Sequence, residues 1–210
     1  MLLTVFRRAC GLSLSPVGRR LYAFSCARRA SGVRAAALAL RLCVAAGVLA
    51  ACSPTYDWRT VSNDASGYSV DLPAKPRSDQ RDVEIAGTPM HMRMQTAEVN
   101  DVLFVVGTVA LPDARSETQQ QALAFLRDGL ARNVGVAPDA RDVAVPVATG
   151  GAIGGIEMRL TGKAGEKGET RTIHARLVAK GTRVYEVAIV GRAEPSVEQV
   201  DQFFRSFRLH

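Results

Sequence analysis

Alternating apolar and polar residues recur from residue 58 onward and predict a series of β-strands. Tyr68, Val70 and Leu72 alternate with Ser69 and Asp71, which is the two-residue period of a strand with one buried face. Two prolines follow and end this strand, because proline cannot donate a hydrogen bond to a neighbouring strand. Related strand patterns return around residues 83–85, 90–94, 143–147, 156–160 and 173–177.

Residues 102–111 are apolar at both alternating positions, which predicts a central strand covered on both faces. Residues 184–190 are also more apolar than the other strands. Short turns connect neighbouring strands: Ala86-Gly87-Thr88 favours a β-hairpin, and Gly181 favours another turn. Consecutive strands joined in this way imply an antiparallel sheet.

Helical spacing appears in two places. Ser116 and Gln119 fit a capping box, and leucines then recur at helical spacing until Gly135 offers a stop. A second helix includes Pro195, which suits a first helical turn. Its apolar face comprises Val197, Val200, Phe203, Phe204 and Phe207. We therefore expect an α+β domain, in which an antiparallel β-sheet is flanked by two main helices.

The segment before the domain has the pattern of a secretory leader. Arg34 and Arg41 supply positive charge, and residues 42–49 form an apolar run. The small residues Ala50-Ala51 then precede Cys52. Residues 49–52 resemble a bacterial lipobox, the signal at which a lipoprotein receives its lipid.

This resemblance implies three parts of the chain. Residues 1–51 are a leader that is removed, residues 52–57 are a lipid-anchored tether, and residues 58–210 are a single domain. Cys52 is the expected site of lipid attachment and then the first residue of a lipoprotein. Because Ser53 follows, where an aspartate typically retains such proteins in the inner membrane, the resemblance favours the outer membrane.

The leader is longer than the usual signal peptide of about 15–30 residues. Initiation at Val33 would give a leader of ordinary length, so the true start is an open question. A mitochondrial transit peptide is the alternative interpretation of residues 1–34, which are rich in arginine and lack acidic residues.

The distribution of charge along the chain bears on which partners the domain can bind. The chain has a formal net charge of +7, but residues 1–51 hold eight arginines and no acidic residue. Residues 52–210 are therefore close to neutral, at −1. Since a nucleic-acid-binding domain needs clustered basic charge, nucleic acid is not an expected partner. Cys52 is the one cysteine beyond the leader, so the remaining chain must be held by its core without an internal disulfide.

Three phrases of the domain carry a further resemblance. They are G-Y-S-V-D-L-P at residues 67–73, G-G-I-E at residues 154–157 and F-F-R-S-F-R-L at residues 203–209. These phrases are similar to the PsbP-type family, whose fold is an antiparallel sheet flanked by helices. The resemblance covers about residues 58–209 and implies a binding module, although a shared fold does not fix function.

The sequence Met90-His91-Met92-Arg93-Met94 is the most suggestive candidate metal site, because thioethers and imidazole suit Cu(I). On a strand, however, the three methionines share one face and His91 points to the other. A packed methionine stripe is therefore the favoured interpretation.

Catalysis has few candidate groups. His91, His174 and His210 are the only histidines, and strand alternation turns His174 outward. The glycine-rich residues 150–155 lack the lysine of a phosphate-binding loop, so a flexible connection is favoured. We expect no catalytic residue, no metal ligand and no cofactor.

Two groups could touch a membrane. Lys163, Lys167 and Arg171 lie near a glycine-rich turn, but interleaved acidic residues favour a solvated turn. Trp58 could lie at the membrane interface, but burial at the first strand is favoured, with Tyr56 left in the tether.

Together these patterns predict a non-catalytic lipoprotein of the bacterial cell envelope. It is expected at the periplasmic side of the outer membrane, anchored through Cys52 and binding an unidentified envelope protein or assembly. One alternative is a carrier of a small ligand or copper, and another is a hydrolase. An apolar pocket with convergent polar groups would favour the carrier, whereas an exposed apolar patch would favour a protein partner.

Overall fold

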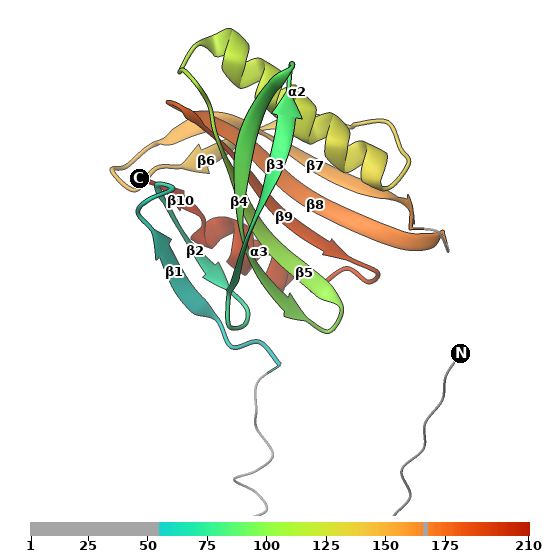
Figure 1. The fold of residues 1–210 in the computed structure, drawn as a ribbon. Helices are drawn as coiled ribbons and strands as arrows, with labels where there is room; N and C mark the ends of the chain where they lie inside the picture. Colours follow the sequence, from blue (N-terminus) through green and yellow to red (C-terminus); the bar gives the residue numbers. More distant parts are fainter. Residues whose placement is uncertain (1–54, 166–167) are drawn as a thin grey trace, which may run out of the picture. The chain divides into compact units, whose positions relative to one another are not determined.

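The computed structural model describes residues 55–165 and 168–210. About 55% of these residues lie in strands and 18% in helices, arranged as two β-sheets and two helices (Figure 1). The elements are β1 (Arg59–Asn63), β2 (Tyr68–Leu72), β3 (Arg77–Ile85), β4 (Thr88–Val99), β5 (Val102–Ala110), α2 (Ser116–Asn133), β6 (Ala140–Pro146), β7 (Ala152–Ala164), β8 (Glu169–Lys180), β9 (Arg183–Gly191), α3 (Val197–Ser206) and β10 (Arg208–Leu209).

The large sheet contains seven antiparallel strands in the order β3-β4-β5-β9-β8-β7-β6. The predicted hairpin between β3 and β4 is confirmed. Ala86 and Gly87 both have positive φ, 49° and 76°, as a two-residue turn of the favoured hand requires. The predicted central strand is also confirmed, because β5 lies between β4 and β9 and is buried along most of its length.

Two apolar cores lie on opposite faces of the large sheet. Figure 1 shows α2 crossing its strands, and the core on this side includes Met90, Met92, Leu126, Leu130 and Leu177. The core on the other side is formed with α3 and the small sheet, and it includes Tyr68, Phe104, Phe203, Phe207 and Leu209. Because both cores are built entirely within Pro54–His210, this segment contains the buried surface it needs to fold by itself.

The small sheet joins the two ends of the domain. Its order is β1-β2-β10, and Arg208 of β10 pairs with Ser69 of β2. A parallel bridge between Val147 and Leu209 connects β10 to the chain just beyond β6, the edge strand of the large sheet.

The predicted α+β class, a sheet flanked by two main helices, is wrong. The structure is mostly β, with a seven-stranded sheet and a second, three-stranded sheet. The ten-residue α3 shares its face of the large sheet with this small sheet. Local periodicity could not show the small sheet, because β10 is separated from β1 and β2 by most of the domain.

The predicted capping box of α2 is also wrong. The helix begins at Ser116, its N-cap is Arg115, and no side-chain hydrogen bond is made at the cap. Gln119 instead donates from Nε2 to the carbonyl oxygen of Gly181 at 2.7 Å. The predicted stop is confirmed, because Gly135 has a φ of +68° just after the helix ends.

The start of α3 differs from the prediction as well. Ser196 is the N-cap, so Pro195 lies before the helix and outside its first turn. Val197, predicted for the apolar face, is 73% exposed, whereas Phe203 and Phe204 are buried as predicted.

Tyr56 and Trp58 both belong to the packed domain. Their rings stack with centroids 5.9 Å apart, and both meet Phe104 edge to face. Tyr56 therefore does not stay free in the tether, and Trp58 is half-buried against the second core. The Asp57 amide donates to the carbonyl oxygen of Pro73 at 2.9 Å, which fixes this entry segment to the residue that follows β2.

Candidate functional site

A cleft separates part of α2 from the large sheet. Two cavities of about 360 and 400 Å³ adjoin there and share Arg81, Leu130, Asn133 and Glu186 as lining residues. We call their combined space the α2 cleft. Much of its inner wall is aliphatic, with Met94, Leu103, Val105, Ile173 and Val190 as contributors. Cavities of about 300–1,000 Å³ with apolar walls and a few polar groups are typical of small-molecule sites.

Glu186 is the buried acidic side chain of the α2 cleft. Alternation along β9 turns Glu186 toward α2 together with Val184 and Ala188. Its neighbours across the ladder are Gly107 of β5 and Leu177 of β8, neither of which can donate from a side chain. The residue is only 8% exposed, and no hydrogen bond or ion pair joins its carboxyl to another residue of the described ranges.

The surroundings of Glu186 change its acidity. Burial raises the pKa of the carboxyl from its ordinary 4.5 to about 7, and the charge of Arg81 opposes this rise only in part. A Cβ at Gly107 would lie 2.2 Å from Cε of Met92, so the glycine opposite Glu186 makes room for that methionine. Near neutral pH, Glu186 can therefore either donate a proton to a hydrogen bond or carry a negative charge.

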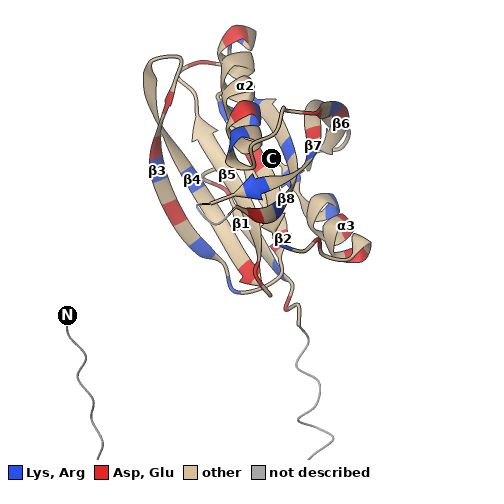
Figure 2. Ribbon diagram, turned by 90° about the vertical axis from the view of Figure 1, so that its right-hand side faces the viewer, with Lys and Arg blue, Asp and Glu red and all other residues tan. Residues whose placement is uncertain are grey.

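Charged residues lie around the opening of the cleft. Figure 2 shows blue and red segments along β3, whereas β5 is uniformly tan. Arg81 of β3 is exposed, and its Nη2 lies 3.3 Å from the sulfur of Met92. On β8, Glu169 pairs with Arg171 at 3.5 Å and with Arg192 at 2.9 Å. Arg171 and Arg192 therefore already pair with a carboxylate, whereas no basic residue of the described ranges forms an ion pair with Glu186.

A second polar cluster lies on the opposite face of the sheet. Glu157 of β7 accepts from Arg141 at 2.5 Å and from Arg176 at 2.6 Å. The guanidinium carbon of Arg176 also lies 4.6 Å from the ring centre of Phe204. Partial burial acts to raise the pKa of Glu157, but the two guanidinium groups outweigh it and lower the pKa overall.

His174 belongs to the same cluster. Its Nε2 lies 2.6 Å from Oε1 of Glu194, whose other oxygen accepts from Arg159, although the ring is not oriented for a good hydrogen bond. Burial lowers the pKa of His174 despite the opposing charge of Glu194, so the ring is mainly neutral at pH 7. These pairs neutralise one another and tie the segment before α3 to the sheet, which suits a structural network.

The methionine stripe is confirmed as a shared face of β4. Met90 and Met92 are buried under α2, and Met94 packs against the same core. His91 lies on the other face, exposed, with Nδ1 2.6 Å from Oδ1 of Asp82. The structure therefore does not bring the imidazole to the sulfur atoms. Within the two described ranges, no group of three histidine, cysteine or acidic residues is arranged to hold a metal ion.

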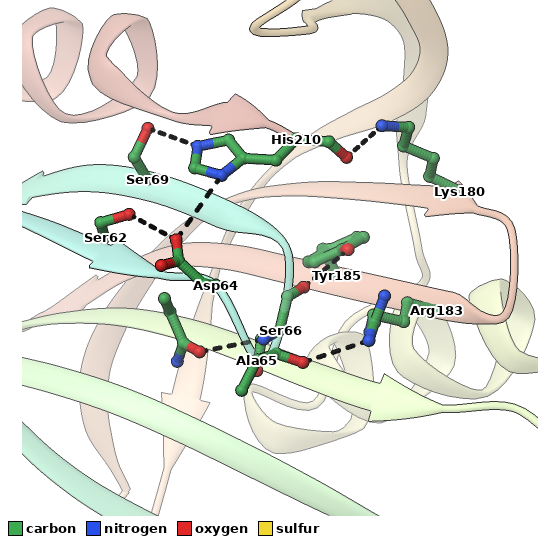
Figure 3. A network of polar contacts seen from close by, with 10 residues as sticks. Ser62, Asp64, Ala65, Ser66, Ser69, Lys180, Arg183, Tyr185 and His210 are labelled. Carbon is green, nitrogen blue, oxygen red and sulfur yellow. Dashed lines mark hydrogen bonds and ion pairs between the residues drawn. The ribbon is translucent and has the colours of Figure 1, made fainter.

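His210 fastens the end of the domain to the β1–β2 turn (Figure 3). Its ring lies 3.3 Å from Oγ of Ser69 and 4.0 Å from Oδ1 of Asp64. Its main-chain oxygen accepts from Lys180, and Tyr185 donates from its hydroxyl to the main chain of the same turn at 2.8 Å. These contacts hold main-chain segments together and leave His210 in a structural role.

The other predicted candidates do not form a site. Cys52, its leader and Lys167 lie outside the described residues. Lys163 donates to Oγ1 of Thr170 at 2.8 Å across the β7–β8 hairpin. Residues 150–155 form a turn and the beginning of β7, as expected for a connection between strands.

Sequence reasoning missed Glu186, although a signal was present. It is the one acidic residue inside β9, whose other interior positions are apolar or aromatic. An acidic residue in a strand that is buried on both faces must be costly unless it has a partner or a function.

Neither a protein-family model nor a curated protein sequence matches the chain. In residues 55–165 and 168–210, neither helix is long and apolar enough to cross a bilayer.

Proposed function

We propose that this domain binds a small molecule with an apolar body in the α2 cleft. The observation that carries the proposal is a buried carboxyl, that of Glu186, on the wall of an otherwise largely aliphatic cavity. This is the combination of apolar surface and a precisely placed polar group by which proteins hold and orient small ligands. Binding without chemistry is proposed, because the cleft walls offer a carboxyl but no nucleophile beside a base.

The surface of the domain favours this role over the docking of a protein. Val197 is the only large hydrophobic side chain that is exposed among the described residues. A single exposed valine does not make the contiguous apolar patch that marks many protein interfaces. Binding of an envelope protein stays a prediction from the sequence.

The test is a titration of residues 54–210 with N-phenylnaphthylamine, a neutral fluorophore whose emission rises in apolar surroundings. We expect saturable binding at one site. Leu103→Trp should abolish it, because Leu103 lines the cleft and the larger ring would fill the space. The matched control is Leu123→Trp, since Leu123 is a half-buried leucine of α2 that does not line the cleft. Absence of saturable binding, or equal binding by both variants, would refute the proposal.

We further propose that a lipid on Cys52 holds this domain at a bacterial membrane, on the periplasmic face of the outer membrane. The support is the resemblance of residues 49–52 to a lipobox and of the basic and apolar residues before them to a secretory leader. In cells that express the full chain, the Cys52→Ser variant should not be lipidated and should not be converted to the mature form. Mass spectrometry of the purified protein should show a chain that begins at Cys52 and carries fatty acid. A mature chain that begins upstream of Cys52, or that lacks lipid, would contradict the proposed anchor. It would leave the proposed ligand binding in the α2 cleft unaffected.

A further inference from the structure

We infer that the ligand of the α2 cleft carries an ammonium group, which pairs with the carboxylate of Glu186. This inference rests on the proposed function and names the chemical class of its ligand: an amine with an apolar body. The amine would lie at Glu186 and the apolar body along the aliphatic wall formed by Leu103, Val105 and Val190.

The first argument is the missing partner of Glu186. More than nine-tenths of the residue is buried, and it lines both cavities of the cleft. A carboxylate with little access to water is destabilised unless donors or a cation replace the lost hydration. The described residues supply no such hydrogen bond, so a donor that enters with the ligand completes the site.

The second argument comes from the charges that face Glu186. The residues of α2 that line the cleft carry no charge, and those of β4, β5 and β7 are also uncharged. The β8 pair Glu169 and Arg171 is mutually neutralised, whereas Asp82 and Glu84 of β3 have the same parity as His91, with which Asp82 pairs, and so turn to the other face. Arg81 is the remaining cation, and it is exposed at the opening rather than buried beside the carboxyl.

This distribution favours a cation over an anion. A ligand carboxylate placed deep in the cleft would meet Glu186 at close range, where low polarity strengthens the repulsion. Its attraction to Arg81 would be weaker, because that guanidinium is in contact with water. An ammonium group, in contrast, gains a buried charge-assisted hydrogen bond with Glu186.

The experiment compares three probes with the same chain: decylamine, decanol and decanoate. Each is titrated calorimetrically into residues 54–210 at about pH 8.5 and about pH 5.5, on either side of the Glu186 pKa of about 7. At the higher pH decylamine should bind about tenfold more tightly than decanol, and decanoate more weakly than decanol. At the lower pH the preference for decylamine should disappear, because Glu186 is then protonated.

Two variants separate the carboxylate from general packing. Glu186→Gln should bind decanol as before and lose the preference for decylamine at both pH values. The matched control is Glu157→Gln, a half-buried glutamate on the opposite face, which should retain the preference. Decylamine binding near pH 7 should also release protons, seen as a dependence of the heat on the buffer, because the ammonium group favours ionised Glu186.

The outcomes distinguish the two proposals. Equal binding of decylamine and decanol at both pH values would refute the ammonium inference and still support an apolar ligand. Tighter binding of decanoate would refute it in favour of an anion held by Arg81. Failure of all three probes to bind would refute both.

Discussion

Glu186 lies at a position of β9 where the apolar pattern of the strand predicts an apolar side chain. Its ionisation makes the free energy of unfolding of the domain depend on pH. Because burial raises its pKa from 4.5 to about 7, the folded domain keeps a proton that the unfolded chain releases in this interval. The free energy of unfolding of the empty domain should therefore fall as the pH rises from about 4.5 to 7 and remain reduced above it. At higher pH the charge costs the fold on the order of 3 kcal/mol.

Glu186→Gln tests this residue directly. Glutamine has nearly the same shape and cannot ionise, so the variant should be more stable than the parent above pH 7, and the two should converge below pH 4.5. Urea unfolding at a series of pH values measures the difference. Parallel pH profiles for the two proteins would show that the carboxyl is not held at a raised pKa.

Gly162 is a second residue that the cleft depends on. A Cβ there would lie 2.0 Å from the carbonyl oxygen of Val134, which also accepts from the Lys163 amide at 2.9 Å. Gly162→Ala must push the end of α2 away from β7, so we expect a loss of about 1–3 kcal/mol in urea unfolding. Gly154→Ala is the control, because nothing lies within 4 Å of a Cβ at that position of the same strand. Equal effects of the two substitutions would contradict this account.

At the scale of elements, α2 forms the cleft wall, and its first turn is fixed from outside the helix. Asp113 accepts from the amide of Arg115 at 3.0 Å, and hydrogen bonds with Thr118 and Arg115 lower the pKa of its carboxyl. Asp113→Ala should therefore lower the Tm, and more clearly at pH 7 than in acid, where the Asp113 carboxyl of the parent is protonated and its contribution is lost. Ser116→Ala should have the smaller effect, since Ser116 caps nothing. Calorimetry of both variants measures the change in Tm. A larger effect of Ser116→Ala would support the predicted capping box and contradict the role of Asp113.

Most elements could be predicted from the sequence, because their order follows local periodicity. The two-residue alternation of β2 and β4 and the helical leucines of α2 each depend on one face meeting a core. The capping of α2 could not be predicted, since Asp113 lies in the loop before the helix. The site could not be predicted either, because Arg81 and Glu186 come to line the same cleft only through the order of strands in the large sheet.

At the scale of the whole molecule, β10 holds the ends of the domain together. Leu209 is completely buried, lies in the small sheet beside Tyr68 and bridges to Val147 beyond β6. The amide of Ala148 donates to the carbonyl oxygen of Leu209 at 2.7 Å, so two main-chain contacts link this residue to the segment just beyond β6. The small sheet is thus fixed to the large one at a point remote in sequence from β1 and β2.

Leu209→Ala should therefore destabilise more than its own strand. Loss of a buried leucine costs about 2–5 kcal/mol, and here the cavity would open between the two sheets. Hydrogen exchange should show reduced protection in β2 and β6 as well as around β10, because both contact it. The control is His210→Ala, which removes an exposed ring whose contact with Ser69 is long, at 3.3 Å, and should leave protection nearly unchanged. Reduced protection confined to β10 in Leu209→Ala would show that the two sheets do not depend on this contact.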